Sequence, residues 1–220
     1  MFEGLKKLRL AAAVALATVA SQSEALTIKL YDAGSDTTVK ITDGSALDTL
    51  AEVGKISTGT VFIGGSSLQL STAFVKDADG KSSLRITATD VAASDLGILK
   101  INVFHDDFQA AAANPMLSNV QFTMNASDLS DNGKVKGMAL AGGQATGPYE
   151  FIAATSDTIS QKTMVALDNP FSMQINTVIS SGTNVTYDAT LVAAVPVPAA
   201  GLLLLTALGG LGLARRRKAA

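Results

Sequence analysis

The stretch Val185-Thr-Tyr-Asp-Ala-Thr-Leu191 alternates apolar and polar side chains at every second position. Successive side chains of a β-strand point to opposite faces, so this period of two predicts a strand with one buried face. The same alternation recurs in Leu99-Lys-Ile-Asn-Val103 and in Phe171-Ser-Met-Gln-Ile175. Because segments far apart in the sequence share this pattern, a sheet fold is predicted rather than a helical one.

Other segments extend the same prediction across residues 26–194. Strands are expected at 26–31, 39–41, 84–88 and 120–124, with shorter ones at 61–63, 68–70, 138–140, 149–153 and 164–167. Turn signals such as Asp43-Gly44, Asn132-Gly133 and Gly142-Gly143 separate them. Short helical turns are expected only at 46–53 and 107–113. We therefore predict a mostly β chain whose body is a single antiparallel β-sandwich, jelly-roll-like in connectivity.

The first 25 residues have the pattern of a secretory signal peptide. Lys6, Lys7 and Arg9 precede an uncharged apolar run, residues 10–20. This run of 11 residues makes a helix of about 16 Å, too short for a hydrocarbon core of about 30 Å. Cleavage is expected after Ala25, with Ala20 as the alternative. The predicted partners at this end are the general secretory translocon and signal peptidase.

The last 26 residues, 195–220, form a second segment of three parts. Val195-Pro196-Val197-Pro198-Ala199 is followed by an apolar run, residues 200–214, and by Arg215-Arg216-Arg217-Lys218. The apolar run predicts a transmembrane helix. Its basic end is expected in the cytoplasm, which leaves the body outside. The two prolines keep the junction extended, as a protease requires.

This three-part pattern resembles the PEP-CTERM class of bacterial sorting signals, and most closely its VPLPA-CTERM subclass. It departs from that subclass at Val197, where Leu is usual. The resemblance implies export, transient anchoring in the inner membrane, and cleavage near Pro196 and Pro198 by an exosortase, a membrane-embedded protease. It also implies a place at the cell surface or in an exopolysaccharide-containing biofilm matrix. The alternative is a single-pass anchor with a basic stop at Arg215, Arg216 and Arg217.

The charge of the whole chain conceals that of the body. The formal net charge is −2, but residues 26–194 carry nine Lys and one Arg against 17 acidic residues, a charge of −7. An acidic exported body is a poor partner for nucleic acid or for an anionic membrane surface. The chain has no Cys, which excludes disulfides and thiolate metal sites.

Catalysis by a Ser-His-Asp triad would require His105, the single His of the chain. No Gly-x-Ser-x-Gly motif presents a nucleophile, and one His does not make a zinc site. We expect His105 at the surface end of a strand, no enzymatic activity and no cofactor.

Calcium is the ion that the sequence fits best. Asp77-Ala78-Asp79-Gly80 has the spacing of an oxygen-ligand loop, but it lacks the third loop ligand and the distal Glu of an EF-hand. A hairpin turn explains the same residues. Asp77 and Asp79 are thus weak metal candidates; the pairs Asp32 with Asp36 and Asp106 with Asp107 are others.

Carbohydrate binding is neither favoured nor excluded. Sugar-binding sites commonly use exposed aromatic platforms, yet the body has no Trp and only Tyr31, Tyr149 and Tyr187. The first hypothesis is a non-catalytic exported surface or matrix protein. The alternative is an extracellular carbohydrate-binding or calcium-assisted adhesion module with the same sorting signal.

Overall fold

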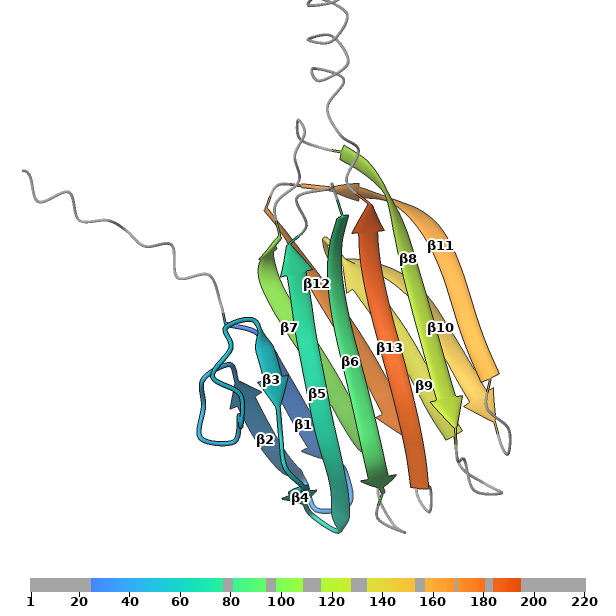
Figure 1. Cartoon of the computed structure of the whole chain (residues 1–220). Coiled ribbons are helices and arrows are strands. Elements are labelled where there is room, and N and C mark those ends of the chain that lie inside the picture. Colours follow the sequence, from blue (N-terminus) through green and yellow to red (C-terminus); the bar gives the residue numbers. More distant parts are fainter. Residues whose placement is uncertain are drawn as a thin grey trace, which may run out of the picture.

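Two antiparallel sheets lie face to face in the computed structural model, which describes residues 25–76, 81–93, 98–108, 116–127, 134–152, 157–168, 170–180 and 184–194 (Figure 1). Sheet A has the strand order β10 (Gln144–Ile152), β9 (Lys134–Ala141), β12 (Phe171–Ile179), β7 (Leu99–Phe108), β1 (Thr27–Asp32), β2 (Thr37–Thr42). Sheet B has the order β11 (Asp157–Leu167), β8 (Met116–Ser127), β13 (Asn184–Ala194), β6 (Lys81–Ala92), β5 (Ser66–Lys76), β3 (Lys55–Ser57), with β4 (Val61–Ile63) also paired to β5.

The chain crosses repeatedly from one sheet to the other. In sheet A, β7 lies between β12 and β1, and in sheet B, β13 lies between β8 and β6. Neighbouring strands therefore come from distant parts of the sequence. The prediction of a mostly β, two-sheet antiparallel body is confirmed.

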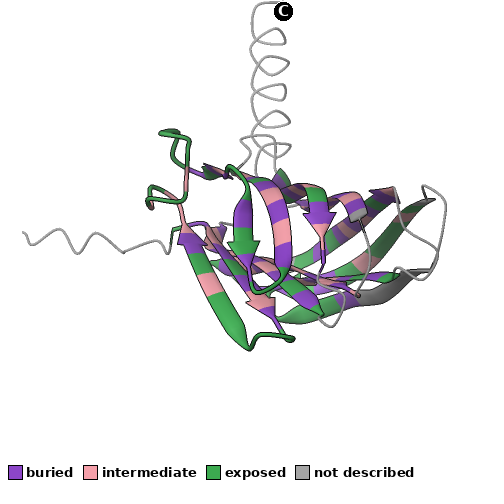
Figure 2. Cartoon of the chain, turned by 90° about the horizontal axis from the view of Figure 1, so that it is seen from below, coloured by how far each residue is buried: buried purple, intermediate pink, exposed green. Residues whose placement is uncertain are grey.

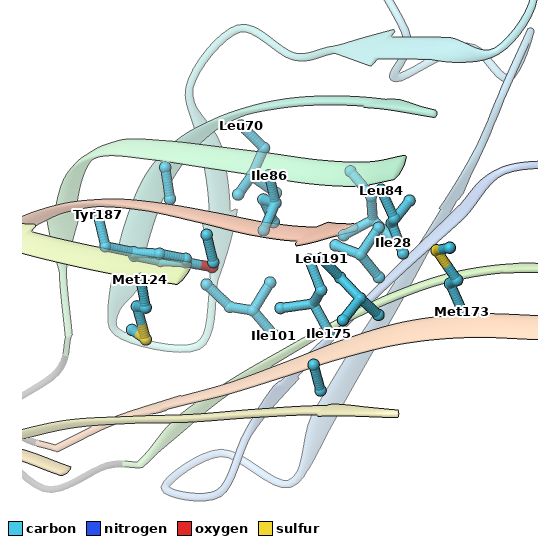
Figure 3. Packing of buried hydrophobic residues seen from close by; sticks show 14 of the residues in the cluster. Ile28, Leu70, Leu84, Ile86, Ile101, Met124, Met173, Ile175, Tyr187 and Leu191 are labelled. Atoms are coloured by element: carbon cyan, nitrogen blue, oxygen red, sulfur yellow. The ribbon is translucent and has the colours of Figure 1, made fainter. Parts of the chain in front are cut away.

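Alternating burial explains why these segments form strands. Every second residue of β12 is buried, beginning with Phe171, Met173 and Ile175. Figure 2 shows the same alternation of buried and more exposed residues along the strands. Side chains from both sheets meet in one apolar cluster (Figure 3). Those labelled there are Ile28, Ile101, Met173 and Ile175 of sheet A and Leu70, Leu84, Ile86, Met124, Tyr187 and Leu191 of sheet B.

The side chain of His105 points inward because β7 alternates regularly up to this residue, with Leu99, Ile101, Val103 and His105 all buried. A β-bulge follows His105 near the end of the strand. Phe171 pairs with Phe108 and Met173 with His105, so two residues of β7 oppose one residue of β12. Asp107, in the bulge, has a φ of 62°. The extra residue shifts the alternation after His105, so that Phe108 also points inward. The expectation that His105 lies at the surface is therefore wrong, because only 1% of it is exposed.

The segment between β2 and β3 folds around a carboxylate instead of forming a helix. Asp48 accepts hydrogen bonds from the backbone N–H groups of Gly44 (3.1 Å), Leu50 (3.0 Å) and Ser57 (3.1 Å). Because these donors are directed at the Asp48 side chain, residues 46–53 form turns, and the prediction of a short helix there is wrong.

The other predicted helical turn is wrong at its start as well. Asp107 and Phe108 are the last residues of β7, and residues 109–113 lie outside the described part.

Both predicted targeting segments fall almost wholly outside the described residues. Ala25 is described and exposed, whereas residues 1–24 and 195–220 are not described. Within the part of the chain that the structure describes, no helix has the length and apolar character needed to cross a membrane.

Candidate binding groove

An open groove lies on the outer face of sheet A, where β1, β7 and β12 run side by side. It has a volume of about 640 Å³. The side chains that line it and point away from the core are the apolar Val178 and the more polar Lys29, Tyr31, Lys100, Asn102, Gln174 and Asn176. Each occupies an outward position of a strand whose alternate residues are buried, so the alternation that builds the core also aligns this face.

Three amide side chains form a row across the floor of the groove. Asn102 on β7 pairs in register with Asn176 on β12, and its Nδ2 donates to Asn176 Oδ1 at 2.5 Å. Gln174 Nε2 donates to the same oxygen at 2.9 Å. Both bonds use the same acceptor, Asn176 Oδ1. The Asn176 Nδ2 donor and the amide oxygens of Asn102 and Gln174 take no part in these two bonds and are left for a ligand or water. The row thus presents donors and acceptors side by side.

The ring of Tyr31 is fixed at one end of the groove. Its hydroxyl donates to Asp36 Oδ1 at 3.1 Å, and the Lys100 ammonium lies 5.3 Å from the ring centre. The hydrogen bond to Asp36 and the negative charges of Asp36 and Asp32 raise the pKa of the Tyr31 phenol. Tyr31 therefore remains a neutral donor, and its ring orients Lys100 over the groove.

Lysines are concentrated on this face. Of the nine lysines in residues 26–194, five lie at exposed outward positions of sheet A: Lys29, Lys40, Lys100, Lys134 and Lys136. The acidic residues near them are fewer: Glu150, which pairs in register with Lys136, Asp36 at the Tyr31 end, and Asp106 near the end of β7. The outer face of sheet A is thus positive, although the body as a whole is negative.

The acidic pairs singled out in the sequence do not converge on an ion. Asp32 Oδ1 accepts from Ser35 N (2.8 Å) and Ser35 Oγ (3.0 Å), and its Oδ2 accepts from Ser66 Oγ (2.8 Å). Burial opposes ionisation of Asp32, but these hydrogen bonds outweigh it and hold the pKa of its carboxyl below the ordinary value. Asp36 instead accepts the Tyr31 hydroxyl. Asp32 therefore ties the β1–β2 turn to β5.

No group of three potential metal-ligating side chains occurs within the described ranges. Asp106 and Asp107 form the bulge of β7, with Asp107 at positive φ. Asp77 and Asp79, the weak calcium candidates, lie outside the described residues. So do the sorting residues Val195, Pro196, Val197, Pro198, Ala199, Arg215, Arg216 and Arg217.

The outer face of sheet B is built differently. Arg85 Nε (2.8 Å) and Nη2 (2.7 Å) both bind Asp188 Oδ2, and Thr87 Oγ1 donates to the same oxygen at 2.7 Å. A hollow of about 190 Å³ beside this pair is lined partly by Asn125, Thr158 and Asp188. Because the Asp188 carboxylate already binds Arg85 and Thr87, the groove on sheet A is the better candidate site.

Sequence reasoning did not find the groove. Its residues come from strands about seventy positions apart, and one sequence does not reveal which strands become neighbours. A signal was nevertheless present, because Lys100, Asn102 and Gln174 fill three of the four polar positions of the predicted strands 99–103 and 171–175. Tyr187 offers no platform for a sugar, because its side chain is fully buried. This burial also raises the pKa of its phenol.

No family model matches this chain, and no curated protein matches it. Among solved structures, the CBM22-1–GH10 modules of endo-1,4-beta-D-xylanase 10B from Clostridium thermocellum, complexed with xylohexaose, are 7% identical, with a TM-score of 0.31 over 57% of this chain and 24% of that one. A family 35 carbohydrate binding module from the same organism is 11% identical, with a TM-score of 0.30 over 55% of this chain and 96% of that one.

The PA14 sugar-binding domain of an RTX adhesin is 16% identical, with a TM-score of 0.34 over 77% of this chain and 89% of that one. The present chain spans about a quarter of the xylanase chain. At such scores the likeness does not extend to a shared site. The function has to be argued from the residues of the groove itself.

Proposed function

We propose that this chain is a non-catalytic, exported surface or matrix protein whose jelly-roll-like β-sandwich binds a polysaccharide in the groove of sheet A. The observation that carries this proposal is the amide row of Asn102, Gln174 and Asn176, which lies beside Lys29, Lys100 and Tyr31. Adjacent hydroxyls of a sugar donate and accept hydrogen bonds together, and side-chain amides match that pattern.

The rest of the groove also suits an extended sugar chain. It is open and not enclosed, and it runs across three strands, so a polymer can enter and leave it at both ends. Phe104, the next outward position of β7, is half-buried and pairs with Gln174. Phe104 is not part of the groove lining, but its ring extends the outer face beside Gln174 with apolar surface that sugar C–H groups could contact.

We further propose that the chain reaches the cell surface through its C-terminal sorting signal. The support is the sequence pattern alone: Val195-Pro196-Val197-Pro198-Ala199, an apolar run, and Arg215, Arg216 and Arg217. An exosortase is the proposed processing enzyme. A matrix polysaccharide at that location would be available to the groove.

Binding is tested with the full chain in detergent, by affinity electrophoresis in gels containing exopolysaccharide extracted from the host, and in a panel of purified neutral and acidic polysaccharides. We expect retardation of the wild type and about tenfold weaker binding for Gln174→Ala/Asn176→Ala, because two hydroxyl contacts are lost. The matched control is Gln121→Ala, an amide on sheet B that donates to Ser160 Oγ at 3.0 Å. Equal retardation of all three proteins, or of none, would refute binding in this groove.

Sorting is tested separately by intact-mass spectrometry of the protein from host cells with and without the exosortase. The expected mass in the normal host lacks Arg215, Arg216 and Arg217, and these residues are retained when the enzyme is deleted. A mature protein that keeps its basic end in both strains would instead support a permanent anchor.

A further inference from the structure

We infer that the ligand of the groove is an acidic polysaccharide, whose carboxylate or sulfate groups are bound by Lys29, Lys40 and Lys100. This inference rests on the proposed function and specifies the chemistry of the ligand. It begins from a pairing that is unfavourable without a ligand: Lys29 on β1 lies directly opposite Lys40 on β2. Like charges at directly opposed positions of an antiparallel pair destabilise the sheet.

A third cation continues this pair toward the amide row. Lys29 pairs with Asn102, and Lys100 is two positions before Asn102 on β7, so Lys100 lies diagonally across from Lys29. Tyr31 holds the Lys100 ammonium above its ring. Three lysines therefore occupy neighbouring positions on three adjacent strands, with Lys29 and Lys100 in the lining of the groove and Lys40 beside it. An anion placed between them would relieve their repulsion.

Tyr31 does not have the geometry of a platform for a neutral sugar. The Lys100 ammonium lies over its ring, and its hydroxyl is engaged by Asp36. The aromatic ring thus serves to position a cation, which is useful only if the ligand carries negative charge. For a neutral glucan, the same residues would place an unneeded charge beside the sugar.

The amide row distinguishes an acidic polysaccharide from DNA. The lysines lie next to Asn102, Asn176 and Gln174, so the ligand must offer hydroxyls beside its anionic groups. Acidic sugars carry both within one unit, whereas the phosphates of DNA have no hydroxyl neighbours. Cations at positions two strands apart in one sheet are about 10 Å apart, and the charges of the polymer should repeat at a comparable distance.

The test compares polygalacturonate with its fully methyl-esterified form, and dextran sulfate with dextran, using the full chain in detergent. We expect the wild type to bind the charged member of at least one pair and to release it as salt rises from about 0.05 M to about 0.5 M. The pair that responds identifies whether carboxylate or sulfate is recognised. Lys29→Gln/Lys100→Gln should bind about tenfold more weakly.

A matched control removes the same charge from the other sheet. Lys81 and Lys162 are exposed on sheet B, and Lys81→Gln/Lys162→Gln should bind as the wild type does. Far-UV circular dichroism of both variants, unchanged from wild type, verifies that they are folded.

The remaining outcomes separate the two proposals. Equal binding of charged and neutral polymers, unaffected by Lys29→Gln/Lys100→Gln, would overturn the acidic ligand and leave polysaccharide binding intact. Failure to bind any charged or neutral polysaccharide would overturn both. If double-stranded DNA bound as tightly as the best polysaccharide, the lysines would be acting as a general anion site and the inference would be wrong.

Discussion

The imidazole of His105 on β7 stacks on the phenyl ring of Phe74 on β5, with ring centres 3.8 Å apart and planes at 13°. The pair joins sheet A to sheet B. The Phe108 ring lies perpendicular to the imidazole with its centre 5.0 Å away, and its centre is 6.0 Å from that of Phe74. The single histidine of the chain is therefore a core aromatic, placed there by the regular alternation of β7.

Removing this ring should destabilise the sandwich. His105→Ala leaves a cavity between Phe74 and Phe108, and we expect a loss of about 2–4 kcal/mol in the free energy of unfolding measured with urea. His105→Phe keeps the stacked ring and should lose less. An unchanged free energy for His105→Ala would show that the interface repacks without the ring.

Asp32 should make stability depend on pH. Its native pKa is lowered, so ionised Asp32 adds stability above the ordinary value of 3.8, and this contribution disappears as the pH falls through the native pKa. The difference in unfolding free energy between wild type and Asp32→Asn should be largest near neutrality and shrink below about pH 4. A difference that stays constant between about pH 7 and about pH 3 would contradict this role of the Asp32 carboxylate.

Asp48 should hold the segment between β2 and β3 in place. In Asp48→Ala the backbone N–H groups of Gly44, Leu50 and Ser57 lose their acceptor, so their hydrogen exchange should accelerate while that of β12 stays unchanged. The cost in global stability should stay near about 1–2 kcal/mol. Exchange rates in this segment equal to those of wild type would contradict the role of the carboxylate.

Gly137 should tolerate no side chain unless Met124 becomes smaller. A Cβ added at Gly137 on β9 would overlap the sulfur of Met124 and come within 3.3 Å of Phe122 Cζ. Gly137→Ala should therefore cost about 1–3 kcal/mol through overpacking. In a double-mutant cycle with Met124→Val, we expect a favourable coupling between the two changes. Strict additivity would mean that the two positions do not touch.

The sequence predicts the strands well where large apolar residues alternate, as in 99–103 and 171–175, which lie inside β7 and β12. It predicts their lengths poorly where the buried positions hold small or polar residues. Thr72 in β5 and Ser82 in β6 are buried, but neither has the apolar character that marks a core position. Those strands are therefore longer than the alternation alone indicates.

The candidate site was harder to predict from the sequence, for a different reason. His105 follows the period of two of β7, but a histidine at a buried position does not have the apolar character that marks a core residue. Lys29, Asn102 and Asn176 are ordinary outward residues, and only the register between β1, β7 and β12 brings them together. Register depends on all the strands at once.

The position of β13 has a mechanical consequence. This strand is hydrogen-bonded along its length to β6 on one side and to β8 on the other, and it ends at Ala194. Tension applied at Ala194 along the strand axis would load the hydrogen bonds to both neighbouring strands at the same time. These bonds would have to break together and not one after another. A sandwich pulled from this end resists unzipping, so a surface protein tethered there would withstand flow better than one pulled from the short edge strand β2.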